Sequence, residues 1–175
     1  KTEKTQREYL TEKELSKIEN LSLPEYSRLD LHRDMFVFAA YVGGLRVSDV
    51  LLLQYNFIDN NHLHTNIRKT GSQLSIKLPR KAMEIIQKWK TAPNASPKFI
   101  FPILPNDINL KDESTEAMKI LDGILSSATA YMNKNLKIIA QKAEIKKNVS
   151  THIARHTWAT RALRKGISID KVSNL

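Results

Sequence analysis

The feature that most limits how this chain can fold is a continuous apolar run, Met35-Phe36-Val37-Phe38-Ala39-Ala40-Tyr41-Val42. The part of a helix that contains this run has no polar face, so it must be covered by protein on every side. We expect that helix to span residues 27–41 and to end at Gly43-Gly44, where a short helix restarts near Arg46. Arg46 is then held between a buried helix and a glycine turn.

Other segments of the chain carry recognisable signals for the start or end of a helix or strand. Thr11 and Glu14 form a capping box, which predicts a helix that runs to about residue 21. Residues 62–67 and 73–78 alternate polar and apolar side chains with Gly71 between them, so we expect a β-hairpin. Lys69 lies near its tip, where a lone lysine is usually solvated. Pro79 starts a further helix that ends around residue 90.

The second half of the chain begins with a loop and continues as helices. Residues 91–112 contain four prolines and little periodicity, with a short buried stretch expected at residues 99–101. Helical patterning returns over residues 115–143, and an interruption near Ser126-Ser127 is left open. Two more helices are expected, one over residues 151–164 closed by Gly166 and one from residue 168 or 169 to the chain end. The predicted fold is one mainly α domain with a small antiparallel β-sheet, in the α+β class.

The amino-acid composition indicates what kind of partner the protein binds. Lysine and arginine number 28 against 18 aspartates and glutamates, which gives a formal net charge of +10 and an isoelectric point near 9.8. This surplus favours a polyanionic partner, although an ordinary basic protein has the same balance. The absence of cysteine excludes disulfides and thiolate metal sites. No apolar run approaches the ~20 residues of a membrane span, and residues 1–10 lack a signal-peptide core. We therefore expect a cytoplasmic protein without a membrane partner.

A second basic cluster, Thr151-His152-Ile153-Ala154-Arg155-His156, lies more than a hundred residues after Arg46. Helical spacing places His152 beside Arg155 and His156. Histidine can donate to a phosphate oxygen or move a proton near neutral pH. Two rigid guanidinium groups aimed at one point, those of Arg46 and Arg155, clamp a tetrahedral oxyanion such as a phosphate. With the positive charge, this pattern indicates a protein that acts on a nucleic-acid backbone.

These residues also have plainer interpretations. Arg46 and Asp49 are three residues apart, as in an ordinary surface ion pair. His152 and His156 have the spacing of metal ligands, but isoleucine stands where the metalloprotease pattern requires glutamate, so we predict no metal site. His156 could instead be a hydrogen-bonded brace.

Together these segments resemble the catalytic domain of tyrosine recombinases, the phage integrase family. Three stretches carry the resemblance, in matching order and at matching separations, and it extends from about residue 9 to the chain end. They are Tyr41-Val42-Gly43-Gly44-Leu45-Arg46-Val47-Ser48-Asp49, Arg68-Lys69-Thr70-Gly71 and His152-Ile153-Ala154-Arg155-His156-Thr157-Trp158-Ala159-Thr160. The residues of these segments are most similar to those of integrases of Bacteroidetes mobile elements. The resemblance implies the DNA breaking-rejoining fold of these enzymes.

The resemblance also implies a role for six side chains. Two arginines would bind the non-bridging oxygens of the scissile phosphate, a lysine would protonate the departing 5′ oxygen, and a histidine would assist at the nucleophile. An aspartate and a second histidine would support them. The two arginines are Arg46 and Arg155, the lysine is Lys69 and the assisting histidine is His152. Asp49 and His156 are the supporting residues. The family uses no metal or other cofactor, because its arginines supply the positive charge.

The sequence departs from that family at its ends. The family's nucleophilic tyrosine, which forms a 3′-phosphotyrosine link, follows the second arginine by a few dozen residues. None of the tyrosines here has that position: Tyr9, Tyr26, Tyr41, Tyr55 and Tyr131. We interpret residues 1–9 as a linker or fragment edge. Residues 10–175 would form the catalytic domain without its C-terminal segment and without the family's N-terminal DNA-clamping domain. We expect this chain alone to bind DNA weakly and to form no covalent intermediate.

The resemblance implies double-stranded DNA as the partner and a homotetramer on paired recombination sites, in a bacterial, nucleoid-associated protein. Two alternatives remain open. A type IB topoisomerase shares the arginine, lysine, arginine and histidine set, and a DNA-binding regulator could keep the fold without catalysis. A tyrosine beyond Leu175, after a Leu-Gly-His segment, would distinguish the enzyme from the regulator.

Overall fold

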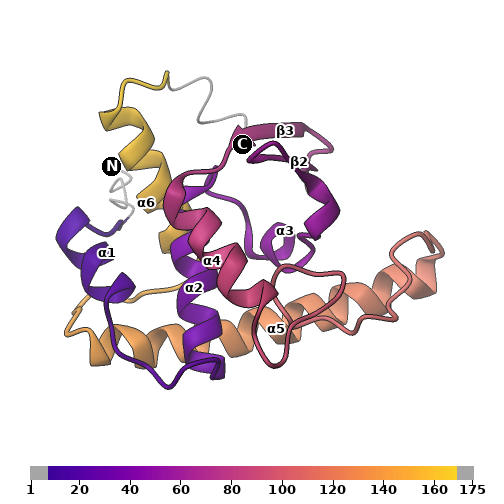
Figure 1. Ribbon diagram of the computed structural model, residues 1–175, viewed down its shortest axis with the longest axis horizontal. Coiled ribbons are helices and arrows are strands. Elements are labelled where there is room, and N and C mark those ends of the chain that lie inside the picture. The colour runs from indigo at the N-terminus through magenta and orange to yellow at the C-terminus, as the bar shows by residue number, and fades with distance from the viewer. Residues whose placement is uncertain (1–7, 169–175) are drawn as a thin grey trace, which may run out of the picture.

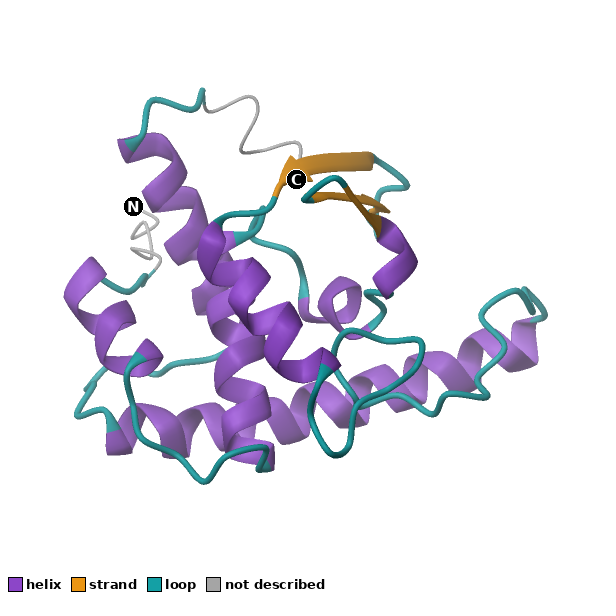
Figure 2. Cartoon of the chain, viewed as in Figure 1, coloured by secondary structure: helices purple, strands orange, loops and turns teal. Residues whose placement is uncertain are grey.

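The computed structural model describes residues 8–168, which fold into six α-helices, one short 3₁₀-helix and a three-stranded sheet (Figures 1 and 2). The predicted mainly α fold with a small antiparallel sheet is confirmed. The helices are α1 (Glu12–Glu19), α2 (Arg28–Tyr41), α3 (Val47–Leu51), η1 (Tyr55–Phe57), α4 (Arg80–Lys90), α5 (Thr115–Lys142) and α6 (Thr151–Arg164), and the strands are β1 (Ile58–Asp59), β2 (His62–Asn66) and β3 (Gln73–Lys77).

Helix α2 is the centre around which the other helices pack. It contacts α1, α4, α5 and α6, and α5 runs below it along the length of the molecule (Figure 1). Every residue from Asp30 to Ala40 is buried, which confirms the burial expected from the apolar run. The 99–101 stretch is also buried as predicted, with the Phe101 ring edge-on to that of Phe38 at 5.4 Å between centroids.

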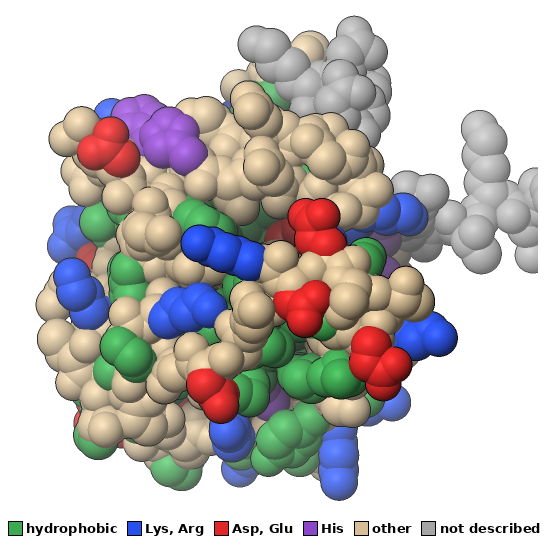
Figure 3. All heavy atoms as spheres, turned by 90° about the vertical axis from the view of Figure 1, so that its right-hand side faces the viewer, with side chains coloured by type: hydrophobic (Ala, Val, Ile, Leu, Met, Phe, Trp, Pro, Cys, Tyr) green, Lys and Arg blue, Asp and Glu red, His purple; other side chains and the backbone are tan. Residues whose placement is uncertain are grey.

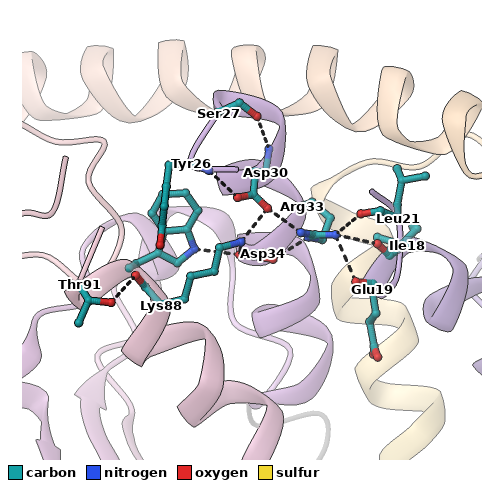
Figure 4. A network of polar contacts seen from close by, with 11 residues as sticks. Ile18, Glu19, Leu21, Tyr26, Ser27, Asp30, Arg33, Asp34, Lys88 and Thr91 are labelled. Atoms are coloured by element: carbon teal, nitrogen blue, oxygen red, sulfur yellow. Dashed lines mark hydrogen bonds and ion pairs between the residues drawn. The ribbon is translucent and has the colours of Figure 1, made fainter. Parts of the chain in front are cut away.

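The buried face of α2 includes charged side chains that the apolar pattern does not predict. Arg33 lies between two carboxylates, with Nη2 2.6 Å from Asp30 Oδ1 and Nε 2.6 Å from Asp34 Oδ1 (Figure 4). Lys88 Nζ of α4 lies 2.7 Å from an oxygen of each carboxylate. Because two acids and two bases share the site, no charge is buried without an opposite partner.

The same network fastens two neighbouring helices to α2. Arg33 Nη1 donates to three backbone carbonyls at and just beyond the C-terminal end of α1, where carbonyls lack the regular helical hydrogen bond to residue i+4. These carbonyls belong to Ile18, Glu19 and Leu21, at 3.4, 3.2 and 2.9 Å. The Trp89 indole N–H of α4 donates to Asp34 Oδ2 at 3.0 Å. Helices α1 and α4 are therefore attached to one short stretch of α2.

The predicted β-hairpin is confirmed. Strands β2 and β3 pair antiparallel from His62–Lys77 to Asn66–Gln73, and β1 lies on the other side of β2. In the turn between them, the Gly71 N–H donates to the Ile67 carbonyl at 2.7 Å. Gly71 has a φ of +68°, which favours glycine. Lys69 is exposed on this turn, as expected.

Helix α5 runs from Thr115 to Lys142 without a break, so the interruption left open at Ser126-Ser127 does not occur. Both serines are exposed, while Leu125, Met132 and Leu136 anchor the helix to the core on either side. Gly166 follows α6 with a φ of +83°, as its predicted capping position requires. The further helix expected from residue 168 or 169 lies outside the described residues.

The beginning of the described chain is attached to its last helix. The Leu10 N–H donates to Thr157 Oγ1 at 2.9 Å, and both residues are buried. On α1, Glu12 accepts from Arg161 Nε of α6 at 2.8 Å. Helix α6, which carries the second basic cluster, is therefore held from the side of α1 as well as by α2 and α5.

His32 makes the stability of this fold depend on pH. It is buried in α2, with Nδ1 2.9 Å from Asn135 Nδ2 of α5. Burial, and secondarily the nearby Arg28 charge, lower the pKa of His32 from 6.5 to about 4. The folded pKa lies below the unfolded one, so this contribution is complete above pH 6.5 and is lost as pH falls toward 4. We expect this group to lower the free energy of unfolding by about 2 kcal/mol between pH 7 and pH 5.

Urea denaturation at the two pH values measures this difference. His32→Gln should reduce it, because the titrating ring is removed, and His64→Gln, which removes an exposed histidine, is the matched control. An unchanged pH dependence in His32→Gln would show that other groups cause it.

Candidate active site

The Gly43-Gly44 turn brings the start of α3 against α6. Both glycines have left-handed φ values, +63° and +57°. A Cβ atom on Gly44 would lie 3.0 Å from Trp158 Cε3 and 3.4 Å from the Arg155 carbonyl oxygen. The Arg155 side chain reaches back, and its Nη1 donates to the Gly44 carbonyl at 2.8 Å. The two basic clusters are therefore in direct contact despite their separation in sequence.

Arg46 and Arg155 line one cavity of about 190 Å³ between α3, α5 and α6. Arg46 is the N-cap residue of α3, and Arg155 lies in the second turn of α6. His152, which is exposed, lines the same cavity, and the catalytic roles of these three residues stay a prediction. The remaining lining residues are Leu45, Val47, Ser48, Thr129, Asn133 and Thr151.

Electrostatics favour an anion in this cavity. Burial lowers the pKa of Arg155 below its ordinary value, and the positive charge of Arg46 lowers it further, while Asp49 opposes the shift. The guanidinium groups of Arg46 and Arg155 therefore repel each other. A phosphate between them would relieve that repulsion and accept hydrogen bonds from both. Arginine keeps its charge despite such shifts, because its ordinary pKa lies far above neutrality.

Asp49 connects the cavity to the hairpin. Its side chain is buried, not on the surface, and Oδ1 accepts from the Arg68 backbone N–H at 2.9 Å. Oδ2 is buried without a hydrogen-bond partner within the described part of the chain. Burial raises the pKa of Asp49, while the Arg68 hydrogen bond and the charges of Arg46, Arg68 and Arg155 oppose the rise. Asp49 therefore fixes the backbone of the residue before Lys69.

The other predicted site residues lie at different depths. Lys69 is exposed on the hairpin turn and is not among the residues that line the arginine cavity. His156 is half-buried, one turn along α6 from His152, and its role as a brace stays a prediction. Within residues 8–168, no group of three or more histidine, cysteine or acidic side chains is arranged to hold a metal ion.

Asn133 is a site residue that the sequence analysis did not identify. Its Oδ1 accepts from the Thr151 backbone N–H at 2.9 Å and so caps the first turn of α6. Ser150 occupies the N-cap position but makes no capping hydrogen bond with its side chain. Asn133 thereby positions the turn that carries His152. Local sequence gives no signal for this cap, because it comes from another helix.

Comparison with known proteins places this geometry in a family. The profile of the phage integrase family matches residues 8–175, and the chain belongs to that family. It is 26% identical over 170 residues to a tyrosine recombinase of Thermosipho africanus, covering 96% of this chain and 52% of the relative. It is 27% identical over 139 residues to tyrosine recombinase XerD of Listeria monocytogenes, covering 77% of this chain and 42% of that protein.

The fold agrees with this placement. The crystal structure of XerA recombinase matches with a TM-score of 0.57 at 16% identity, over 94% of this chain and 53% of that one. The chain thus spans about half the length of the relatives it matches. The resemblance to Bacteroidetes mobile-element integrases stays a prediction. None of the helices within residues 8–168 is long and apolar enough to cross a membrane.

The contact between Gly44 and Trp158 can be tested by adding one methyl group. Gly44→Ala should lower the free energy of unfolding by ~2–3 kcal/mol, because a left-handed φ and a crowded Cβ add together. Gly71→Ala is the matched control: its φ is also positive but nothing lies within 4 Å of the added carbon. It should cost only the backbone strain of ~1–2 kcal/mol. Equal losses in urea denaturation would contradict the packing of the Gly43-Gly44 turn on α6.

Proposed function

We propose that this chain is the catalytic domain of a site-specific DNA recombinase that cuts and rejoins duplex strands through a 3′-phosphotyrosine intermediate. The observation that carries the proposal is the arginine cavity: Arg46 and Arg155, from distant parts of the chain, line one small cavity in a member of the phage integrase family. Its charge and size fit one phosphate of a DNA strand. We assign the role of nucleophile to none of the tyrosines in this chain.

The arginine cavity supports one chemical step, transfer of a phosphodiester. The tyrosine oxygen forms a bond to phosphorus, the bond from phosphorus to the 5′ oxygen breaks, and the reverse reaction rejoins a strand. Negative charge grows on the non-bridging oxygens in the transition state. Arg46 and Arg155 would stabilise that charge with fixed donors, which need no reorganisation during the reaction. The arginines supply charge that metal ions supply in other phosphoryl-transfer sites.

Proton transfer falls to the residues around the arginines. Lys69 would give a proton to the departing 5′ oxygen, and the bond between Asp49 and the Arg68 N–H supports this role by fixing the base of the turn. His152 lines the cavity and would hydrogen-bond or move a proton at the nucleophile. Asp49 and His156 would act by positioning these groups.

The larger assembly is also part of the proposal. Residues 10–175 would form the catalytic domain and residues 1–9 the linker before it. Four copies would bind paired recombination sites on double-stranded DNA, in the cytoplasm and associated with the nucleoid. The support is the net charge of +10, which favours DNA as the partner, and the similarity to tyrosine recombinases.

Conservative substitution tests the two arginines. Arg46→Lys or Arg155→Lys in the complete protein should reduce strand cleavage roughly 100-fold or more, because a point charge cannot replace a bidentate donor. The free energy of unfolding should stay within about 1 kcal/mol of the parent. Covalent protein–DNA adduct on the recombination site is the measurement. Arg80→Lys, whose side chain is 93% exposed on α4, is the matched control. If either variant cleaved DNA at the parental rate, the substituted arginine would not be part of the active site.

Salt dependence tests the nucleic-acid partner directly on this chain. Affinity for duplex DNA should fall steeply between ~50 and ~200 mM salt, because bound lysines and arginines release counterions from phosphates. Fluorescence anisotropy with a labelled duplex measures the slope. A flat affinity over this range would contradict a DNA-binding surface.

A further inference from the structure

An ion pair connects the hairpin turn to α5. Arg68, the residue before Lys69, places Nη2 2.6 Å from Asp122 Oδ1 in the N-terminal half of α5. Its backbone N–H is bonded to Asp49 of α3 at the same time. The turn that carries Lys69 is therefore fastened twice through one residue: to α3 by its backbone and to α5 by its side chain.

This ion pair lies along a groove that leads away from the arginine cavity. Ser48, Thr129 and Asn133 line both that cavity and a wider concavity of about 630 Å³, which continues along α5 to Arg68 and Asp122. Arg68 also lines a larger groove of about 990 Å³ between the sheet and the start of α5. Figure 3 shows the molecule from the side of the hairpin and the start of α5, where exposed hydrophobic side chains lie between basic and acidic ones.

The pair is too exposed to hold the turn strongly. The Arg68 and Asp122 side chains are 35% and 57% exposed, and exposed ion pairs contribute little to stability. A backbone phosphate offers the guanidinium the same two-oxygen geometry that a carboxylate does. A DNA strand in the groove would also repel the Asp122 carboxylate while attracting Arg68. Exchange of the carboxylate for a phosphate is therefore favourable once DNA is bound.

We propose that Arg68 is a further DNA-backbone-binding residue, and that Asp122 holds its guanidinium across the groove until a phosphate takes the place of the carboxylate. This inference rests on the proposed function. The exchange frees the tip of the hairpin from α5 while the bond to Asp49 remains. Lys69 can then move with the bound DNA strand, because the neighbouring Arg68 is bound to a phosphate of that strand.

Binding of a generic duplex at fixed salt tests the exchange. Asp122→Asn should bind ~2- to 5-fold more tightly, because Arg68 no longer has to leave a carboxylate. Arg68→Gln should bind more weakly and lower the slope of log affinity against log salt by about one. In Arg68→Gln/Asp122→Asn, the gain from Asp122→Asn should disappear. Glu116→Gln is the matched control, since it removes one exposed negative charge from the first turn of α5.

Two outcomes would overturn the proposal while the DNA-binding function stands. Asp122→Asn and Glu116→Gln could tighten binding equally, or Asp122→Asn could keep its full effect in the Arg68→Gln background. Either result would assign the effect to net charge alone. A failure of the parent chain to bind any DNA would instead contradict the proposed function.

A measurement without DNA keeps the two questions separate. Amide hydrogen exchange at residues 69–71 should be faster in Asp122→Asn than in the parent, because the turn loses its attachment to α5. It should be unchanged in Glu116→Gln. Equal exchange in Asp122→Asn and the parent would show that the ion pair does not hold the turn.

Discussion

The burial of α2 from Asp30 to Ala40 depends on mutual neutralisation of its charged side chains. Arg33 is covered by protein because Asp30 and Asp34 flank it and Lys88 closes the group. Removal of one partner would leave a charge in the core without a counterion, which costs far more than the intact group contributes. The arrangement also sets the positions of α1 and α4, since both are bonded to it. The second half of α2, from Met35 to Ala40, is apolar, and the helix ends just before the Gly43-Gly44 turn.

The candidate active site is built where that buried helix ends. A side chain at Gly44 would meet Trp158 and the backbone of α6, so the absence of a Cβ atom lets the two basic clusters touch. Arg155 then holds the Gly44 carbonyl, and Asn133 caps the start of α6 from α5. Contacts among three helices thus hold the Arg155 guanidinium and the start of α3, which carries Arg46, in place before any ligand arrives, and such preorganisation is what transition-state stabilisation requires.

The charged group around Arg33 and the arginine cavity differ in their charge balance. Around Arg33 the charges cancel, which suits a structural role. In the arginine cavity, Arg46 and Arg155 repel each other and Asp49 offsets them only partly, because one carboxylate faces two guanidinium groups. The cavity keeps a positive charge that an anion would neutralise. The Arg68–Asp122 pair is intermediate: it is neutral, exposed and open to exchange.

The amino-acid sequence is enough to predict the elements whose causes are local. The apolar run specified a buried helix, the Thr11–Glu14 box a helix start, and alternation around Gly71 a hairpin. It also identified Arg46 and Arg155 as partners, through motifs that family members share. It could not show that Asp49 turns toward the hairpin, that Asn133 caps α6, or that charged residues lie inside around Arg33. Those contacts join residues from different helices and loops, and only the tertiary structure decides which distant polar groups become neighbours.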